Sequence, residues 1–156
     1  MKYQDHLDSA ALEQYASALN TRAKQARASG RLSASDLRDR ILESGGLCEW
    51  CGRGLVNDAF ELDHIISLKQ RGANTAENLA VACPDCNRQK GQKHPARFAA
   101  EISLATPRKT ALVKRILRHY AMESLEQASL FTEPASQRES AGKDSRDSTG
   151  EPHYRW

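Results

Sequence analysis

The sequence has 156 residues, of which 39% are hydrophobic and 6% aromatic, and its formal net charge is +3. This length excludes large barrels and two-domain dinucleotide-binding enzymes, and it favours one small domain with flanking segments. The sequence has no apolar run of about 18 residues, and its N-terminal MKYQDHLDSA lacks the apolar stretch of a secretory signal. We therefore expect a cytoplasmic protein.

The charge is distributed unevenly along the chain. Residues 48–87 carry three basic and six acidic side chains, whereas residues 88–120 carry nine basic side chains and one acidic side chain. The net charges of these two segments are therefore −3 and +8. A dense basic segment favours a polyanionic partner, although a solvated helix face can also be basic without binding anything.

Two helices are predicted at the start of the chain. Asp8 or Ser9 can cap a first helix, and Gly30 suits the position that follows its end. Ser33 and Asp36 resemble a capping box for a second helix, which a Ser-Gly-Gly sequence then ends.

An extended segment, a loop and an apolar run follow. Residues 60–66 are predicted to be extended, residues 67–77 to form a polar loop, and residues 79–82 to form a short apolar run. Pro84 stands where a new helix would start, because proline is well tolerated in the first helical turn.

The last predicted helix lies in the basic part of the chain. Thr106 and Pro107 predict its start, as a cap followed by proline at the first helical position. We expect it to run to about Gln127. Residues 132–156 are rich in Ser and Glu, contain Pro and Gly, and have almost no aliphatic side chains, so we expect them to be disordered.

All four cysteines lie in two C-x-x-C pairs, Cys48 with Cys51 and Cys83 with Cys86. Together the pairs supply the tetrahedral sulfur set that a structural Zn²⁺ prefers. Two disulfides in a secreted protein are an alternative, against which the N-terminal sequence argues, and a redox pair would not normally occur twice. We therefore expect a structural zinc ion, which would also stabilise a small core.

A second, harder cation site is predicted between and after these pairs. Asp63 and His64 are adjacent, so on a strand their side chains point to opposite faces, and one can bind a metal while the other approaches a substrate. Asn87 follows the second pair and can offer a carbonyl oxygen. Carboxylate and amide oxygens completed by water are ligands that Mg²⁺ accepts. Nearby, Glu61 is interpreted as a solvated strand-edge residue and Trp50 as a core residue.

The stretch from Leu47 to Lys93 resembles the HNH endonuclease motif of the ββα-metal (treble-clef) nucleases, through CEWCGRGL, ELDHIISLKQRGANTAENL and CPDCNRQKG. The resemblance implies an α+β, mainly helical fold, with an HNH core flanked by N- and C-terminal helices. It implies that Asp63 is a metal ligand and that His64 is the general base that deprotonates the attacking water. Asn78 would orient the loop that holds this histidine, and Asn87 would take the position of the motif's last, metal-binding histidine.

On this resemblance we expect an endonuclease that hydrolyses DNA, with the double helix as substrate, using Mg²⁺ or Mn²⁺ and no covalent intermediate. Basic side chains that follow the motif are expected to contact phosphates: Arg88, Lys90, Lys93, Lys109, Lys114, Arg115 and Arg118. The alternatives are a zinc module that binds nucleic acid without cutting it, and a zinc scaffold for protein contacts. Neither alternative requires Asp63, His64 and Asn87.

The sequence thus divides into an N-terminal helical region (1–46), an HNH core (47–94), a basic helical region (95–131) and a disordered tail (132–156). At the third boundary, Gln127, Leu130 and Phe131 lie in QASLF, which resembles the short peptide by which bacterial replication and repair proteins bind the sliding clamp. The alternative is that this Leu-Phe pair folds back on the core.

Overall fold

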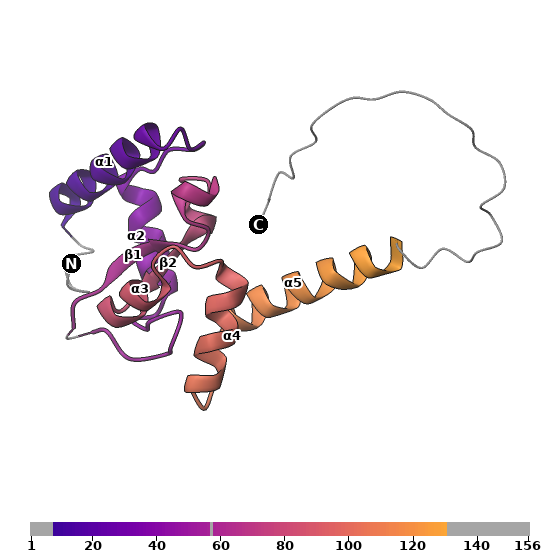
Figure 1. Cartoon of the computed structure of the whole chain (residues 1–156). Coiled ribbons are helices and arrows are strands. Elements are labelled where there is room, and N and C mark those ends of the chain that lie inside the picture. The colour runs from indigo at the N-terminus through magenta and orange to yellow at the C-terminus, as the bar shows by residue number, and fades with distance from the viewer. Residues whose placement is uncertain (1–7, 57, 131–156) are drawn as a thin grey trace, which may run out of the picture.

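The computed structural model describes residues 8–56 and 58–130, and within the last helix it describes side chains as far as Glu123. These residues form five α-helices and one two-stranded sheet (Figure 1), so the fold is mixed α/β and mainly helical, as expected. None of the described helices is long and apolar enough to cross a membrane.

The first two helices are α1 (Ser9–Gln25) and α2 (Ala34–Glu43). The Asp8 carboxylate caps α1 by accepting bonds from the backbone N–H groups of Ala10 and Ala11. The predicted capping box of α2 is present, because Ser33 and Asp36 exchange side-chain to backbone hydrogen bonds.

Gly30 does not end the first helix, contrary to expectation. α1 ends at Gln25, and the chain leaves it through Arg27, whose φ of 55° is already left-handed. Gly30 has a φ of 91° and lies further along, where a Cβ atom would come within 2.8 Å of the carbonyl oxygen of Asn74. This glycine therefore permits a close approach between two distant segments.

The two strands, β1 (Glu61–His64) and β2 (Leu79–Ala82), pair antiparallel, with Asp63 opposite Ala80. The helix α3 (Pro84–Lys90) begins directly after β2, with Cys83 as its N-cap and Pro84 in its first turn. The extended segment predicted within residues 60–66 and the helix start at Pro84 are thus confirmed, and the apolar run at 79–82 is the second strand. α3 packs against both strands.

The C-terminal region holds two helices, α4 (Pro95–Ala105) and α5 (Ala111–Leu130), where one was predicted. Thr106 is the C-cap of α4, and its hydroxyl donates to the carbonyl oxygen of Ile102. The cap of α5 is Thr110, whose hydroxyl accepts from the backbone N–H of Val113. The predicted helix start at Thr106 and Pro107 is therefore wrong by about one turn.

One hydrophobic core joins the flanking helices to the strands. Leu12 of α1, Ile41 of α2 and Ile116 of α5 belong to the same buried cluster as Trp50 and Ile65. Trp50 is completely buried, as predicted, and lies edge-on against the ring of Phe98 with centroids 5.0 Å apart. The helices outside the predicted nuclease core therefore share its packing.

Candidate functional site

The four cysteines meet at one point between the first C-x-x-C turn and the start of α3. Their sulfur atoms all lie within 4.8 Å of one another. The backbone N–H of Cys83 donates to Sγ of Cys48 at 3.3 Å, and that of Cys86 donates to Sγ of Cys83 at 3.4 Å. Among the described residues, these four cysteines are the one group of three or more Cys, His, Asp or Glu side chains that lie close enough together to hold a metal.

The electrostatics of this cluster suit a soft divalent cation. A hydrogen bond from Cys86 lowers the pKa of Cys48 to about 4, and the same contact raises the pKa of Cys86. Burial raises the pKa of Cys51. Four crowded thiols cannot all ionise unless a cation compensates their charge. The cluster could therefore hold a metal such as zinc, as its tetrahedral sulfur donors predict.

Asp63 lies on the face of β1 that is turned toward Trp50 and α3. One carboxylate oxygen accepts from Nε1 of Trp50 at 3.2 Å, and the other accepts from Nζ of Lys90 at 3.1 Å. Burial raises the pKa of Asp63 to about 6, although the bonds from Lys90 and Trp50 act in the opposite direction. This carboxylate is thus buried and bonded at both of its oxygens.

Lys90 is buried, which is contrary to the expectation that it contacts phosphates. Its side chain is 0% exposed, and Nζ donates both to Asp63 and to the carbonyl oxygen of His64, at 2.7 Å from the latter. The sequence placed Lys90 among basic neighbours, but the helical period turns it inward from α3, where it compensates a buried carboxylate.

Asn87 pairs with Glu61 between α3 and β1, as Lys90 does with Asp63. The Asn87 amide nitrogen donates to the Glu61 carboxylate, a contact that leaves the amide oxygen Oδ1 as the atom available to a cation. Glu61 is half-buried, so the prediction of a solvated strand-edge residue is wrong. Because Glu61 and Asp63 are two residues apart on β1, both carboxylates lie on the face toward α3.

His64 points away from these carboxylates, toward the loop before Asn78. Its Nε2 lies 3.0 Å from Oδ1 of Asn74, and Nδ2 of Asn74 donates to Oδ1 of Asn20 in α1 at 2.8 Å. Burial lowers the pKa of His64, and the positive charges of Arg22 and Lys90 lower it further, whereas the bond to Asn74 acts against this shift.

Asn78 is buried at the end of the loop that joins the two strands. Its Oδ1 accepts from the backbone N–H of Ile66 at 2.9 Å, and its Nδ2 donates to the carbonyl oxygens of Ile66 and Ala73. The side chain therefore closes the loop that follows His64, which is the geometry that its expected role requires.

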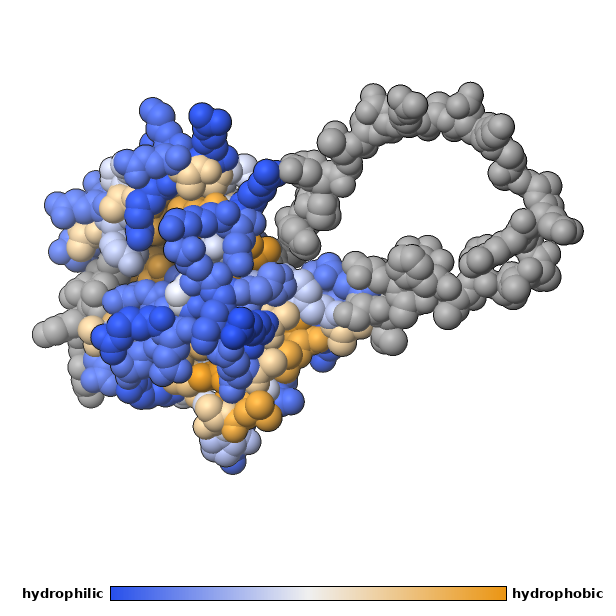
Figure 2. Space-filling view, viewed as in Figure 1, coloured by the Kyte–Doolittle hydropathy of each residue, from blue (hydrophilic) through white to orange (hydrophobic). Residues whose placement is uncertain are grey.

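The expected phosphate-binding side chains lie in different surroundings. Arg88 is exposed and bonded to Asp85, whereas Nζ of Lys93 is bonded to Glu101 at 2.5 Å. The exposed side chains among the remainder are Lys109, Lys114, Arg115 and Arg118. Figure 2 shows a largely hydrophilic face with an apolar area over α4 and α5. Leu104 of α4 is an exposed apolar side chain. The expected clamp motif lies outside the residues whose side chains are described.

Sequence reasoning missed Asn74, Asn20 and the inward position of Lys90. Asn74 is 0% exposed although it lies in a polar loop, and its bonded partner belongs to α1, 54 positions earlier. No local pattern signals such a contact, because hydrophobic periodicity and short motifs describe neighbours along the chain.

A comparison with known families identifies the region that carries these side chains. The family model described as HNH endonuclease matches residues 48–93. We therefore call residues 48–93, which match this family model, the HNH domain. The HNH domain includes the four cysteines, both strands and α3, but neither α1 nor α2.

Two curated proteins are similar to part of this chain. The type IV methyl-directed restriction enzyme EcoKMcrA of Escherichia coli (strain K12) is 38% identical over 68 residues, 40% of this chain and 24% of that protein. The CRISPR-associated endonuclease Cas9 of Corynebacterium diphtheriae (strain ATCC 700971 / NCTC 13129 / Biotype gravis) is 32% identical over 78 residues, 49% of this chain and 7% of that protein. The chain thus spans a quarter or less of either relative. No solved structure is significantly similar to it.

Proposed function

We propose that this chain is a metal-dependent endonuclease that hydrolyses DNA phosphodiester bonds with His64 as the general base. The observation that carries the proposal is a half-buried imidazole, held by Asn74 and adjacent in β1 to a carboxylate, inside an HNH domain. The names of the two relatives, a restriction enzyme and an endonuclease, support this class of activity.

The state of His64 suits this role. Because burial and the charges of Arg22 and Lys90 lower its pKa, the imidazole is neutral at physiological pH and can accept a proton from water. The bond to Asn74 holds the ring in one orientation, which a base needs if it is to meet the attacking water at a fixed angle.

Oxygen donors on the opposite face of β1 fit a hard cation. Asp63, Asn87 and, in addition, Glu61 offer carboxylate and amide oxygens, and a carboxylate whose two oxygens each accept one bond still has lone pairs for a metal. These residues would hold Mg²⁺ or Mn²⁺, which when bound would stabilise the negative charge that develops on the phosphate. Trp50 and Lys90 hold the buried Asp63 carboxylate in place, so β1 would not need to rearrange for Asp63 to bind the cation.

A second candidate is a zinc module that binds nucleic acid without cutting it. The observation in its favour is that Lys90 already compensates the charge of Asp63, which gives this carboxylate a structural use. In that case the pairing of His64 with Asn74 would serve only to pack the loop.

Plasmid cleavage separates the two candidates. Supercoiled plasmid is incubated with zinc-loaded protein and Mg²⁺ or Mn²⁺, and wild type is compared with His64→Ala. We expect nicked or linear product from the wild type and at least a hundredfold slower cleavage by His64→Ala, since a general base contributes about 10²–10⁴-fold. His119→Ala is the matched control, because this histidine lies on α5 and is paired with Glu123. Binding of DNA without cleavage by the wild type would favour the zinc module.

We propose that the exposed basic side chains of α5 hold the DNA backbone. Lys114 and Arg118 lie one turn apart on α5 and are exposed, so both can reach phosphates on one strand. We expect affinity for duplex DNA to fall steeply with salt, and each substitution by Ala to reduce the slope of log K against log salt by about one. Fluorescence anisotropy measures this, with the exposed Lys24→Ala as the control on α1. Equal slopes for all three variants would contradict the assignment.

A further inference from the structure

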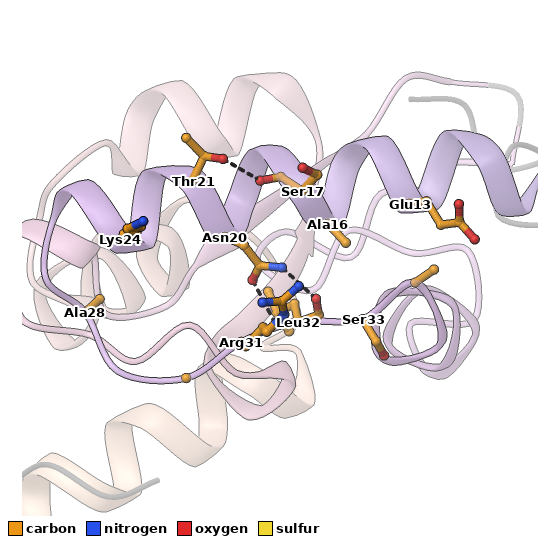
Figure 3. A pocket seen from close by; sticks show the side chains of 12 residues that line it. Glu13, Ala16, Ser17, Asn20, Thr21, Lys24, Ala28, Arg31, Leu32 and Ser33 are labelled. Carbon is orange, nitrogen blue, oxygen red and sulfur yellow. Dashed lines mark hydrogen bonds between the residues drawn. The ribbon is translucent and has the colours of Figure 1, made fainter.

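A chain of hydrogen bonds leads from His64 out of the HNH domain. His64 Nε2 is 3.0 Å from Asn74 Oδ1, and Asn74 Nδ2 is 2.8 Å from Asn20 Oδ1. Asn20 in turn bonds twice to the backbone of Leu32, with its Oδ1 accepting from the N–H at 2.9 Å and its Nδ2 donating to the carbonyl oxygen at 2.8 Å. Figure 3 shows Asn20 reaching from α1 to the Leu32 backbone.

The backbone of Leu32 determines the direction of every bond in this chain. A backbone N–H can only donate, so the atom of Asn20 that faces it must be the oxygen. That oxygen also faces Asn74, which must therefore present its amide nitrogen there and its own oxygen to His64. An amide oxygen can only accept, so Nε2 of His64 must carry the proton. In the neutral ring, the lone pair is then on Nδ1.

The segment that precedes Leu32 fixes Asn74 from a second side. The carbonyl oxygen of Ser29 accepts from the backbone N–H of Asn74 at 2.7 Å. Gly30 lies so close that a Cβ atom would be 2.8 Å from the carbonyl oxygen of Asn74. Asn74 is 0% exposed, so water does not compete for its side-chain bonds. The connection between α1 and α2 is therefore built directly against the partner of His64.

We infer that Asn20 and Asn74 are positioning residues that hold His64 in the Nε2–H form, with Nδ1 as the basic atom, and that the α1–α2 pair is thereby part of the catalytic unit. This inference rests on the proposed function, in which His64 is the base. The two asparagines act through His64, and Leu32 contributes only backbone groups. An HNH domain cut out at residues 48–93 would lack Asn20 and Leu32, although it would keep His64 and Asn74.

The experiment compares two substitutions of Asn20 in the full chain loaded with zinc. Asn20→Leu removes both polar atoms at similar volume, whereas Asn20→Asp keeps the oxygen that accepts from Leu32 and from Asn74 and loses only the bond donated to the Leu32 carbonyl oxygen. Thr21→Ala is the matched control, because it deletes a hydrogen bond on the same helix, to Ser17, that does not lead to His64. Long-range ¹H–¹⁵N correlation spectra at alkaline pH report the protonated ring nitrogen, and His64→Ala identifies the His64 signals.

For the wild type, Asn20→Asp and Thr21→Ala, we expect a His64 ring proton on Nε2 that exchanges slowly with water. In Asn20→Leu we expect this proton to exchange at least about tenfold faster, and kcat for plasmid cleavage to fall about tenfold with KM unchanged, because the ring is no longer held at a fixed angle. A wild-type proton on Nδ1, or an Asn20→Leu protein with the wild-type spectrum and wild-type kcat, would overturn the inference. If the spectra behave as expected but no variant cleaves DNA, the hydrogen-bond chain is supported and the proposed nuclease function fails.

Discussion

The two faces of β1 are built from different parts of the chain. The face with Glu61 and Asp63 meets Asn87 and Lys90 of α3, so all four contacting residues belong to the HNH domain. The other side, where His64 lies, meets Asn74 and, behind it, α1 and the α1–α2 connection, which are outside the domain.

This difference indicates that the domain boundary and the boundary of the site do not coincide. The face of β1 that carries Glu61 and Asp63, here called the carboxylate face, is formed with Asn87 and Lys90. These side chains lie within 30 positions of one another, on the two-stranded hairpin and the helix that follows it. The side of β1 on which His64 lies, here called the imidazole face, depends on a contact that spans more than 50 positions, between Asn20 and Asn74. Substitutions at each face, and at the cysteine cluster beneath them, can test this division.

Removing the metal that we expect at the four cysteines should have the largest effect, because it should disrupt both faces of β1 together. Structural zinc contributes about 10–16 kcal/mol in small zinc domains, which is as large as the whole free energy of unfolding of a typical domain. We expect chelation, or Cys86→Ser, to unfold residues 48–93 and abolish cleavage. Circular dichroism on heating measures this, and zinc added back to chelated wild type should restore the transition. An unchanged melting curve after chelation would contradict a structural metal.

Lys90→Met should damage mainly the carboxylate face. It removes the buried partner of Asp63, and loss of one member of a buried ion pair typically costs about 3–5 kcal/mol. Since burial already raises the pKa of Asp63 to about 6, the carboxyl can take up a proton, and the loss should be smaller at about pH 5 than at about pH 8.

Urea denaturation at both pH values measures this change in the free energy of unfolding. The control is Lys69→Met, which removes the same charge at an exposed position and should change the stability by less than about 0.5 kcal/mol. A loss that is equal at both pH values would show that Lys90 stabilises the domain by packing and not by its charge.

Gly30→Ala should damage mainly the imidazole face. Its φ of 91° is strained for alanine, and the added Cβ would meet the backbone of Asn74, so we expect a loss of about 1–3 kcal/mol and slower cleavage. Gly45→Ala is the control, since Gly45 also has a positive φ, of 60°, but a Cβ atom there would meet nothing within 4 Å. Equal losses in thermal denaturation would mean that backbone strain alone, and not the contact with Asn74, accounts for the effect.

The pH dependence should show the smallest effect. Burial, Arg22 and Lys90 lower the pKa of His64 below its ordinary 6.5, so the neutral base persists to lower pH, and the acid limb of kcat/KM should have an apparent pKa below 6.5. Arg22→Gln removes one positive charge, so this apparent pKa should move upward and cleavage at about pH 5.5 should slow about twofold. An acid limb at or above 6.5 in the wild type would contradict the assignment of His64.

Much of the site could be predicted from local sequence. The two C-x-x-C pairs, the Asp63-His64 dipeptide and the amide of Asn78 lie in short patterns whose chemistry depends on near neighbours, and the cysteines do converge. The capping box of α2 and the start of α3 at Pro84 were predictable for the same reason. In the C-terminal region, the Thr106-Pro107 pattern was misleading, because a threonine hydroxyl can end one helix as readily as it begins another.

The sequence by itself therefore determined the class of chemistry: sulfur donors for a metal, and a histidine beside a carboxylate within the HNH motif. Only the tertiary structure decided how each group is used. It turned Lys90 inward to Asp63, paired Asn87 with Glu61, and linked His64 to Leu32 through the amides of Asn74 and Asn20. The physical reason is that a buried polar group must find a partner wherever the fold provides one, and for Asn74 that partner lies 54 positions away.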